Sequence, residues 1–210
     1  MYLYDSVLFD FDGVIMDSEP VHFDCWRAVL EPLGVNVDWD RYGSQCIGIS
    51  DYAMLEMLGA QSRPPVSADR LWQEYGRKNQ LFVARVVDDP PVPAATHSLI
   101  EELAASPLKL GIVSSSASAE VETILKASGL REHFEVVICG DHVNHFKPHP
   151  EPYELAAQYL CVKNPLVVED SDSGEASGRA AGFTVARIDH ADNTARIVRQ
   201  LLITEIMSTL

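Results

Sequence analysis

Apolar residues along the chain gather in short runs that are rich in β-branched side chains. Five of these runs predict buried strands of a parallel sheet, because strands covered on both faces read as continuous apolar runs. They are Val7–Phe11, Lys109–Val113, Val136–Cys139, Leu166–Val168 and Thr184–Ile188. Helical periodicity fills the segments between the later runs, at Ala94–Ala105, Ala119–Ser128, Pro150–Leu160 and Ser173–Ala181. This alternation predicts an α/β fold with a parallel sheet.

The segment between the first two runs has a different pattern. It contains helical periodicity at Val21–Leu33, Asp51–Leu58 and Ala68–Val83, and no convincing strand. Proline pairs mark its interior, at Pro64-Pro65, and its far end, at Pro90-Pro91. We therefore expect residues 16–89 to form a small helical domain inserted after the first strand, with residues 1–15 and 90–210 as the discontinuous core.

Composition and charge narrow the possible partners. The 210 residues are 47% hydrophobic and carry a formal net charge of −15, which argues against nucleic acid or an anionic membrane as a partner. A phosphorylated small molecule stays possible, because a bound cation can reverse the local charge of an acidic cleft. No signal peptide, membrane-length apolar stretch or CxxC pair is evident, so we expect a cytoplasmic protein. The sequence leaves the oligomeric state open, with a monomer slightly favoured.

Two aspartates stand at the carboxyl end of the first predicted strand, in Asp10-Phe11-Asp12-Gly13. Gly13 permits a sharp turn that would let both carboxylates point into one site. Ligands of open α/β sheets bind at this end of the strands. Taken alone, the motif is also compatible with a solvated loop that carries helix-capping aspartates.

Polar residues also follow three later strands. The hydroxyls of Ser114-Ser115-Ser116, helped by backbone N–H groups at the next helix start, can donate to phosphate oxygens. Lys147 precedes a predicted helix and can offset negative charge. Glu169 and Asp170 would repel each other unless a cation lay among them, and ligation by oxygen alone suits Mg²⁺.

Each of these motifs has an ordinary alternative when it is taken alone. The serines can cap a helix, the lysine can be solvated, and the acidic pair can belong to a turn. Their order is the informative feature, because aspartates, hydroxyl, lysine and acidic pair each follow a different strand. Independent accidents would rarely produce this series, which predicts a joint site for a phosphate and a cation.

Together the motifs resemble the haloacid dehalogenase superfamily, specifically its members with a helical cap after the first strand. The matching residues are Asp10-Phe11-Asp12-Gly13-Val14, Asp17-Ser18, Ser114, Lys147-Pro148 and Glu169-Asp170-Ser171 with Gly174. The resemblance spans essentially the whole chain. It implies a Rossmann-like core, a mobile cap and a Mg²⁺ cofactor.

The resemblance also implies catalytic roles. Asp10 would be the nucleophile that forms an aspartyl-phosphate, and Asp12 the general acid and base. Ser114 and Lys147 would hold the transferring phosphoryl group. Ser115 and Ser116 are candidate substrate contacts beside them.

The same resemblance implies a set of metal ligands. Asp10, Asp170 and the backbone carbonyl of Asp12 would bind Mg²⁺. Glu169 would be either a further ligand or a residue that supports the ligands.

The function implied is a phosphatase for a small phosphorylated metabolite, such as a sugar phosphate or phosphoglycolate. Asp12 argues against dehalogenation, because a halide leaving group needs no acid. A β-phosphoglucomutase-like phosphomutase is the alternative. Asp51 and Ala117 stand where the mutase carries an arginine and a lysine, which favours the phosphatase. Gly48 and Lys78 are the candidate substrate contacts in the cap.

Two other hypotheses have less support. A phospho-receiver signalling module also uses acids, a hydroxyl and a lysine around Mg²⁺. Such modules are shorter, lack the insert, and carry the acceptor on a middle strand. His142 and His145 lie three residues apart, and without further nearby ligands we interpret them as polar loop residues rather than a zinc site.

Overall fold

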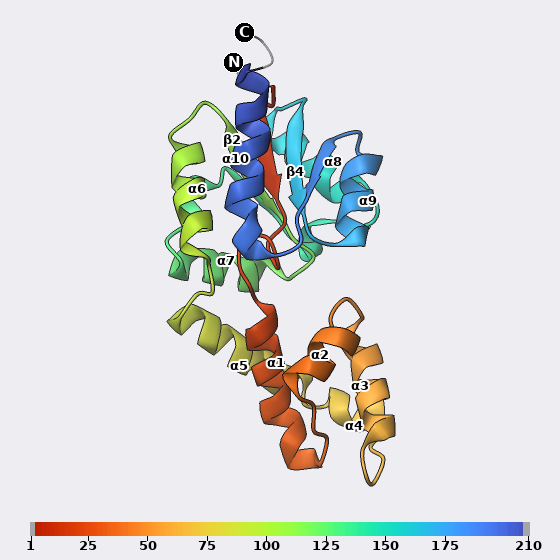
Figure 1. Ribbon diagram of the computed structural model, residues 1–210. Coiled ribbons are helices and arrows are strands. Elements are labelled where there is room, and N and C mark those ends of the chain that lie inside the picture. Colours follow the sequence, from red (N-terminus) through yellow and green to blue (C-terminus); the bar gives the residue numbers. More distant parts are fainter. Residues whose placement is uncertain (1–2, 208–210) are drawn as a thin grey trace. The chain divides into compact units, whose positions relative to one another are not determined.

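The computed structural model describes residues 3–207, with side chains described as far as Leu202. Its sheet has five parallel strands in the order β3-β2-β1-β4-β5 (Figure 1). The strands are β1 (Ser6–Phe9), β2 (Lys109–Val113), β3 (Val136–Ile138), β4 (Pro165–Glu169) and β5 (Thr184–Arg187). The predicted α/β fold with a parallel sheet is confirmed.

Helices alternate with the strands of this core. They are α6 (Ala94–Ala104), α7 (Ser118–Ala127), α8 (Glu151–Leu160), α9 (Asp172–Ala180) and α10 (Ala191–Met207), with 3-10 turns η2 (Arg131–His133) and η3 (Gly140–His142). Helix α6 packs beside α10, and α8 packs beside α9 (Figure 1). Helix α10 is not among the helices that the sequence patterns predict.

The register of the sheet brings the ends of three strands together. Phe9, the last residue of β1, pairs with Ile112 on one side and Val168 on the other. Every residue of β1 and β4 is buried, which fits a central position in the sheet. The residues that follow these strands therefore meet at one edge of the core.

Residues 18–89 form a separate compact unit, called unit 2 here, while residues 1–17 and 90–210 form unit 1. Unit 2 is helical throughout its regular elements. These are α1 (Glu19–Leu30), η1 (Glu31–Leu33), α2 (Trp39–Gln45), α3 (Asp51–Gln61), α4 (Ala68–Trp72) and α5 (Tyr75–Asp88).

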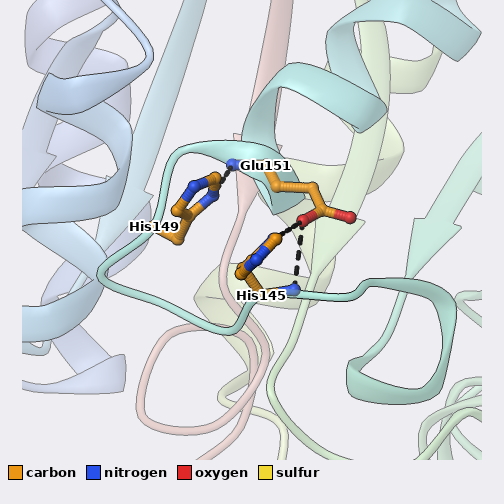
Figure 2. Close-up of side chains that lie close together, drawn as sticks. All are labelled: His145, His149 and Glu151. Carbon is orange, nitrogen blue, oxygen red and sulfur yellow. Dashed lines mark hydrogen bonds and ion pairs between the residues drawn. The ribbon is translucent and has the colours of Figure 1, made fainter.

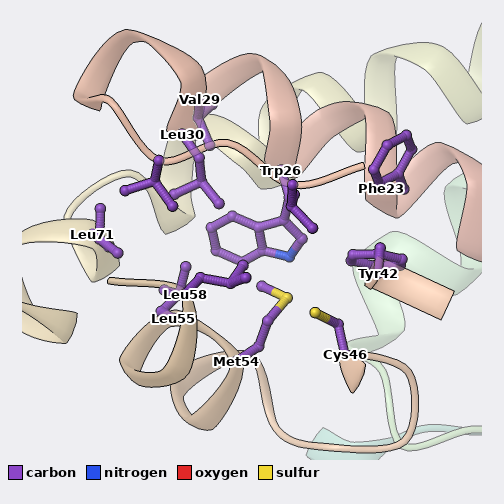
Figure 3. Packing of buried hydrophobic residues seen from close by; sticks show 12 residues of the cluster. Phe23, Trp26, Val29, Leu30, Tyr42, Cys46, Met54, Leu55, Leu58 and Leu71 are labelled. Atoms are coloured by element: carbon purple, nitrogen blue, oxygen red, sulfur yellow. The ribbon is translucent and has the colours of Figure 1, made fainter. Parts of the chain in front are cut away.

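Unit 2 has an apolar core of its own, centred on Trp26 (Figure 3). The Trp26 indole is fully buried, and its Nε1–H donates to Asp51 at 3.2 Å. Leu55 from α3 and Leu71 from α4 pack into the same cluster. Burial of this kind stabilises short helices that would be marginal alone.

One predicted helix of unit 2 was wrong. The pattern over Ala68–Val83 predicted a single helix, but the structure has α4 and α5 with a break between them. At the break, the backbone N–H of Glu74 donates to Leu71, which is a turn rather than a helical spacing. The rings of Trp72 and Tyr75 stack across it at 4.5 Å.

None of the helices described, over residues 3–207, is both long enough and apolar enough to cross a membrane.

Candidate active site

The end of strand β1 leads into a tight turn that carries both aspartates. The backbone N–H of Asp10 still donates to Val168 on β4, at 2.9 Å. Gly13 then adopts a left-handed conformation with φ of 74°, which glycine adopts without steric cost. A Cβ atom at Gly13 would lie 2.1 Å from Oδ2 of Asp170. Glycine is therefore needed here for its backbone angle and for the close approach of Asp170.

Lys147 is the central cation of the site. Its Nζ lies 2.5 Å from Asp10 Oδ1, 2.6 Å from Glu169 Oε1 and 2.8 Å from the backbone carbonyl of Val113. These contacts engage all three ammonium donors. The side chain is only 4% exposed. Lys147 thus bridges the ends of β1, β2 and β4, and it neutralises part of a buried negative cluster.

Glu169 is completely buried behind this lysine. Its Oε1 accepts from Lys147 and from the Tyr153 hydroxyl at 2.7 Å. Its Oε2 accepts from the backbone N–H of Asp170 and from the N–H and hydroxyl of Ser171. A Cβ at Gly174 would lie 1.8 Å from Oε1, so helix α9 can approach the carboxylate only because glycine stands there. Because these donors fix the Glu169 carboxylate, Glu169 can hold Lys147 in place.

The three serines after β2 differ in their exposure and in their contacts. Ser114 is buried, and its Oγ accepts from the backbone N–H of Ser116 at 3.0 Å. The Ser116 hydroxyl donates to Oδ2 of Asp12 at 3.0 Å. Ser115 is exposed. The structure therefore joins Asp12 to Ser116, a contact that spacing alone does not indicate.

Burial controls the electrostatics of the acidic groups. It raises the pKa of Asp10 well above its usual value; Lys147 opposes this shift, and Glu169 adds to it. Burial and the nearby Glu169 raise the pKa of Asp170 to about 6. For Lys147, burial lowers the pKa, but the Asp10 and Glu169 carboxylates outweigh it and raise the pKa overall. The lysine therefore stays charged near neutral pH.

Three carboxylates of the site can converge on a cation. One oxygen each from Asp10, Glu169 and Asp170 lies within 4.8 Å of the others. Three oxygen donors and a surplus of negative charge suit Mg²⁺. The side chain of Asp12 turns to Ser116 instead, so any role of Asp12 as a ligand would fall to its backbone carbonyl. The residues present fit the metal that the resemblance implies.

The two candidate contacts in the cap belong to unit 2. Gly48 has φ of 85° in the loop before α3. Lysines on helices are usually exposed, but Lys78 is 2% exposed, and its Nζ lies 5.3 Å from the Phe82 ring centroid and 5.4 Å from that of Trp26. The His22 imidazole stacks on Phe82 at 4.0 Å, and burial together with Lys78 lowers the pKa of His22 to about 3.

Tyr153 and Ser171 are site residues that the sequence does not single out. Both donate to Glu169. Helical periodicity indicates a buried position for Tyr153, but it cannot indicate which group its hydroxyl meets. Ser171 caps α9 by accepting from Gly174, and such a cap can be recognised from sequence although its contact with Glu169 cannot.

Comparison with known proteins identifies the family of the chain. Residues 7–188 match the family model of haloacid dehalogenase-like hydrolases. The fructose-1-phosphate phosphatase YqaB of Escherichia coli is 33% identical over 86% of this chain and 94% of its own. The β-phosphoglucomutase of Bacillus subtilis is 26% identical over 85% of this chain and 80% of its own.

A solved structure shares the fold. The β-phosphoglucomutase of Clostridium difficile superposes with a TM-score of 0.69 at 21% identity, over 98% of this chain and all of its own. The chain belongs to the haloacid dehalogenase-like hydrolases, within their phosphatase and β-phosphoglucomutase-like subgroup.

Proposed function

We propose that this chain is a Mg²⁺-dependent phosphatase that transfers the phosphoryl group of a small phosphorylated metabolite to Asp10 and then to water. The observation that best supports this proposal is the contact of Lys147 with both Asp10 and Glu169, beside Asp170. A carboxylate can approach an anionic phosphate only where its own charge is offset. This arrangement places a buried cation on the proposed nucleophile.

The first step is attack by the Asp10 carboxylate on phosphorus. A bond forms between Asp10 and phosphorus while the ester bond between phosphorus and the leaving oxygen breaks. Asp12 gives its proton to that leaving oxygen. The Ser116 hydroxyl, 3.0 Å from Asp12, orients the carboxyl group for this transfer.

The second step returns Asp10 to its starting state. Asp12, now ionised, takes a proton from a water molecule as the water attacks the phosphorus of the aspartyl-phosphate. The bond between phosphorus and Asp10 breaks, and inorganic phosphate leaves. Splitting the reaction in this way replaces one difficult displacement with two easier ones.

Asp10, Asp170 and the backbone carbonyl of Asp12 are the proposed metal ligands, and Glu169 supports them through Lys147 and Ser171. A bound Mg²⁺ would neutralise phosphate charge and favour the ionised form of Asp10. Ser114 would donate to a phosphoryl oxygen, and Lys147 would do the same by giving up one of its three present contacts, with Ser115 and Ser116 nearby. Gly48 and Lys78, both in unit 2, are the further residues that we propose for substrate selection.

The phosphomutase stays the second candidate, favoured by the Bacillus subtilis relative. Two features weigh against it. Asp51 accepts from the Trp26 indole and so belongs to the packing of unit 2. Ala117, at the N-terminal end of α7, offers no side-chain donor for a second phosphate.

The decisive test measures phosphate release from a panel of sugar phosphates and phosphoglycolate. Fructose 1-phosphate should be included because the Escherichia coli relative is named for it. Asp10→Asn should reduce kcat by roughly 10³-fold or more, and Asp12→Asn by about 10²–10⁴-fold. Asp141→Asn is the control: this exposed aspartate, which accepts from Ser118, should keep near-normal kcat. Normal turnover by Asp10→Asn would refute the proposed nucleophile.

A second experiment separates the two candidate reactions. The enzyme is incubated with β-glucose 1-phosphate and the matching bisphosphate, and both products are followed. We expect free phosphate to appear faster than glucose 6-phosphate. The reverse order would assign the chain as a mutase.

A further inference from the structure

A second cluster of metal-binding side chains lies outside the proposed phosphoryl site. His145 and His149 are exposed and Glu151 is partly buried, all in the segment that leads from η3 into α8. One ligand atom from each lies within 4.8 Å of the others. Figure 2 shows the two imidazole rings side by side and the Glu151 carboxylate directed at His145. The proposed reaction uses none of these residues.

From the sequence alone, we consider His145 together with His142, whereas the structure places it beside His149. His142, three residues earlier, has its Nδ1 3.1 Å from the backbone N–H of Cys139, and so it helps to close η3. His149 is the residue that joins His145, with ring centroids 4.4 Å apart and an interplanar angle of 25°. Spacing along the chain does not reveal this pair, because the loop folds back on itself between the two rings.

The donor set differs from that of the proposed Mg²⁺ site. Two imidazole nitrogens and one carboxylate suit ions such as Zn²⁺, Ni²⁺ or Cu²⁺, whereas Mg²⁺ prefers oxygen donors alone. Three protein ligands leave a position for water, as in open zinc sites. The chemistry of the cluster therefore selects a transition metal.

The Glu151 carboxylate is held in place by the loop itself. Its Oε1 accepts from the backbone N–H of Asn144 at 2.9 Å and from the Asn144 amide at 3.2 Å. Its Oε2 accepts from the backbone N–H of His145 at 3.0 Å. Hydrogen bonds of this kind fix the orientation of metal ligands and raise affinity.

Binding of a metal ion would replace two hydrogen bonds that the ligands now make. His145 Nδ1 lies 2.6 Å from Glu151 Oε2, and an ion would displace the proton they share. His149 Nδ1 accepts from the backbone N–H of Glu151 at 3.2 Å. An ion bound at Nδ1 would replace that hydrogen bond, and one bound at Nε2 would require the ring proton to move to Nδ1. Ligand atoms on one zinc ion lie roughly 3.3 Å apart, a spacing that rotation of exposed side chains can reach.

We propose that His145, His149 and Glu151 bind a zinc-class divalent ion that braces the loop carrying Lys147. The ligands lie on both sides of Lys147 in the chain, so a shared ion would close the loop around it. Lys147 contacts both Asp10 and Glu169. The ion would thus restrict the backbone from which the central cation of the site extends.

Calorimetric titration with ZnCl₂ tests this proposal. The protein is first stripped with chelator and then kept in saturating Mg²⁺, so that the oxygen donors of the core are occupied. Wild type should bind about one equivalent of Zn²⁺. His145→Ala and His149→Ala should each weaken the affinity at least about tenfold, since each removes one ligand.

His97→Ala is the matched control. His97 forms a histidine–glutamate pair with Glu101 at 3.5 Å, and that pair belongs to no three-ligand group among the described residues. Zinc affinity should be unchanged in this variant. Co²⁺ offers a second readout, because nitrogen ligation with four or five ligands gives strong visible absorption, which His149→Ala should abolish.

Three results would overturn the proposal. The first is the absence of zinc uptake by wild type, and the second is uptake that both histidine variants retain. The third is loss of zinc uptake in Asp170→Asn together with normal uptake in His149→Ala, which would place the ion among the core carboxylates. Both readouts measure binding, so they stand whether or not the proposed phosphatase activity is found.

Discussion

Tyr153 shows how much one hydroxyl can contribute at the scale of a residue. It is fully buried, and it donates to a carboxylate that also holds Lys147. Tyr153→Phe should lower the free energy of unfolding by about 1.5–3 kcal/mol, because it removes a buried hydrogen bond to a charged group. It should also reduce kcat, since Glu169 then constrains Lys147 less firmly.

Tyr159 on the same helix provides the control for chemical denaturation and steady-state kinetics. It is 68% exposed, so Tyr159→Phe should change stability by less than about 0.5 kcal/mol. If the two variants behave alike, the hydroxyl of Tyr153 has no special role.

The raised pKa of Asp170, about 6, leads to a prediction about pH. The protonated carboxyl group cannot bind the metal, so protons compete with Mg²⁺ as the pH falls through 6. The apparent dissociation constant for Mg²⁺ should rise by up to about tenfold per pH unit below that point. Titration at pH 7 and pH 5 measures the change, and equal affinity at both values would contradict the prediction.

At this scale, the sequence indicates which residues gather but not how they are joined. Asp10, Lys147 and Asp170 can be found because parallel strands end at a common edge. The contacts of Tyr153 and Ser171 depend on how helices α8 and α9 lie against the sheet. Periodicity predicts which face of a helix is buried, but not the atom that a side chain meets.

At the scale of elements, the turn after β1 is constrained both by the left-handed angle of Gly13 and by the close approach of Asp170. Gly13→Ala would add strain of about 1–2 kcal/mol in the left-handed region, and its Cβ would displace Asp170. We expect weaker Mg²⁺ binding and at least a tenfold loss of kcat/KM. Steady-state kinetics across a Mg²⁺ titration measures both effects.

Gly34→Ala is the control that measures the backbone strain without the contact with Asp170. It has φ of 78°, close to that of Gly13, but a Cβ added there would meet no described atom within 4 Å beyond its chain neighbours. Gly34→Ala should therefore cost similar stability and leave Mg²⁺ binding intact. A similar loss of Mg²⁺ affinity in both variants would show that the contact with Asp170 is unimportant.

Most elements with a strong apolar pattern are predicted well; helix α10 is an exception, and the weakly patterned helix α2 is also missed. The second strand is predicted with its observed bounds, Lys109–Val113, because every residue after Lys109 is apolar and buried. Helix α2 has only seven residues and little periodicity. Helix α10 was missed although Ala191, Ala195, Val198 and Leu202 recur every three or four residues and are all buried. The break between α4 and α5 depends on ring stacking that no periodicity encodes.

At the scale of the molecule, the alternation of strands and helices predicts the class of fold but not the strand order β3-β2-β1-β4-β5. Many orders satisfy the same pattern of apolar runs, so the Rossmann-like arrangement follows from the resemblance of the motifs. Chain topology is set by which strands pair, and pairing between distant segments leaves little trace in a single sequence.

The two units have separate apolar cores, and this separation should be visible during unfolding. Leu55 is fully buried in unit 2, and Leu8 is fully buried in the sheet of unit 1. Each substitution to alanine should remove about 2–5 kcal/mol from the unit that contains it. All three tryptophans of the chain, Trp26, Trp39 and Trp72, lie in unit 2.

Tryptophan fluorescence therefore reports the unfolding of unit 2 alone, whereas circular dichroism follows the helices of both units. Leu55→Ala should move the fluorescence transition to lower denaturant. Leu8→Ala should leave the fluorescence transition unchanged. It should move the part of the circular dichroism transition that belongs to unit 1 to lower denaturant. If either variant shifts both signals equally, the two cores unfold as one cooperative unit, and the prediction of separate unfolding is wrong.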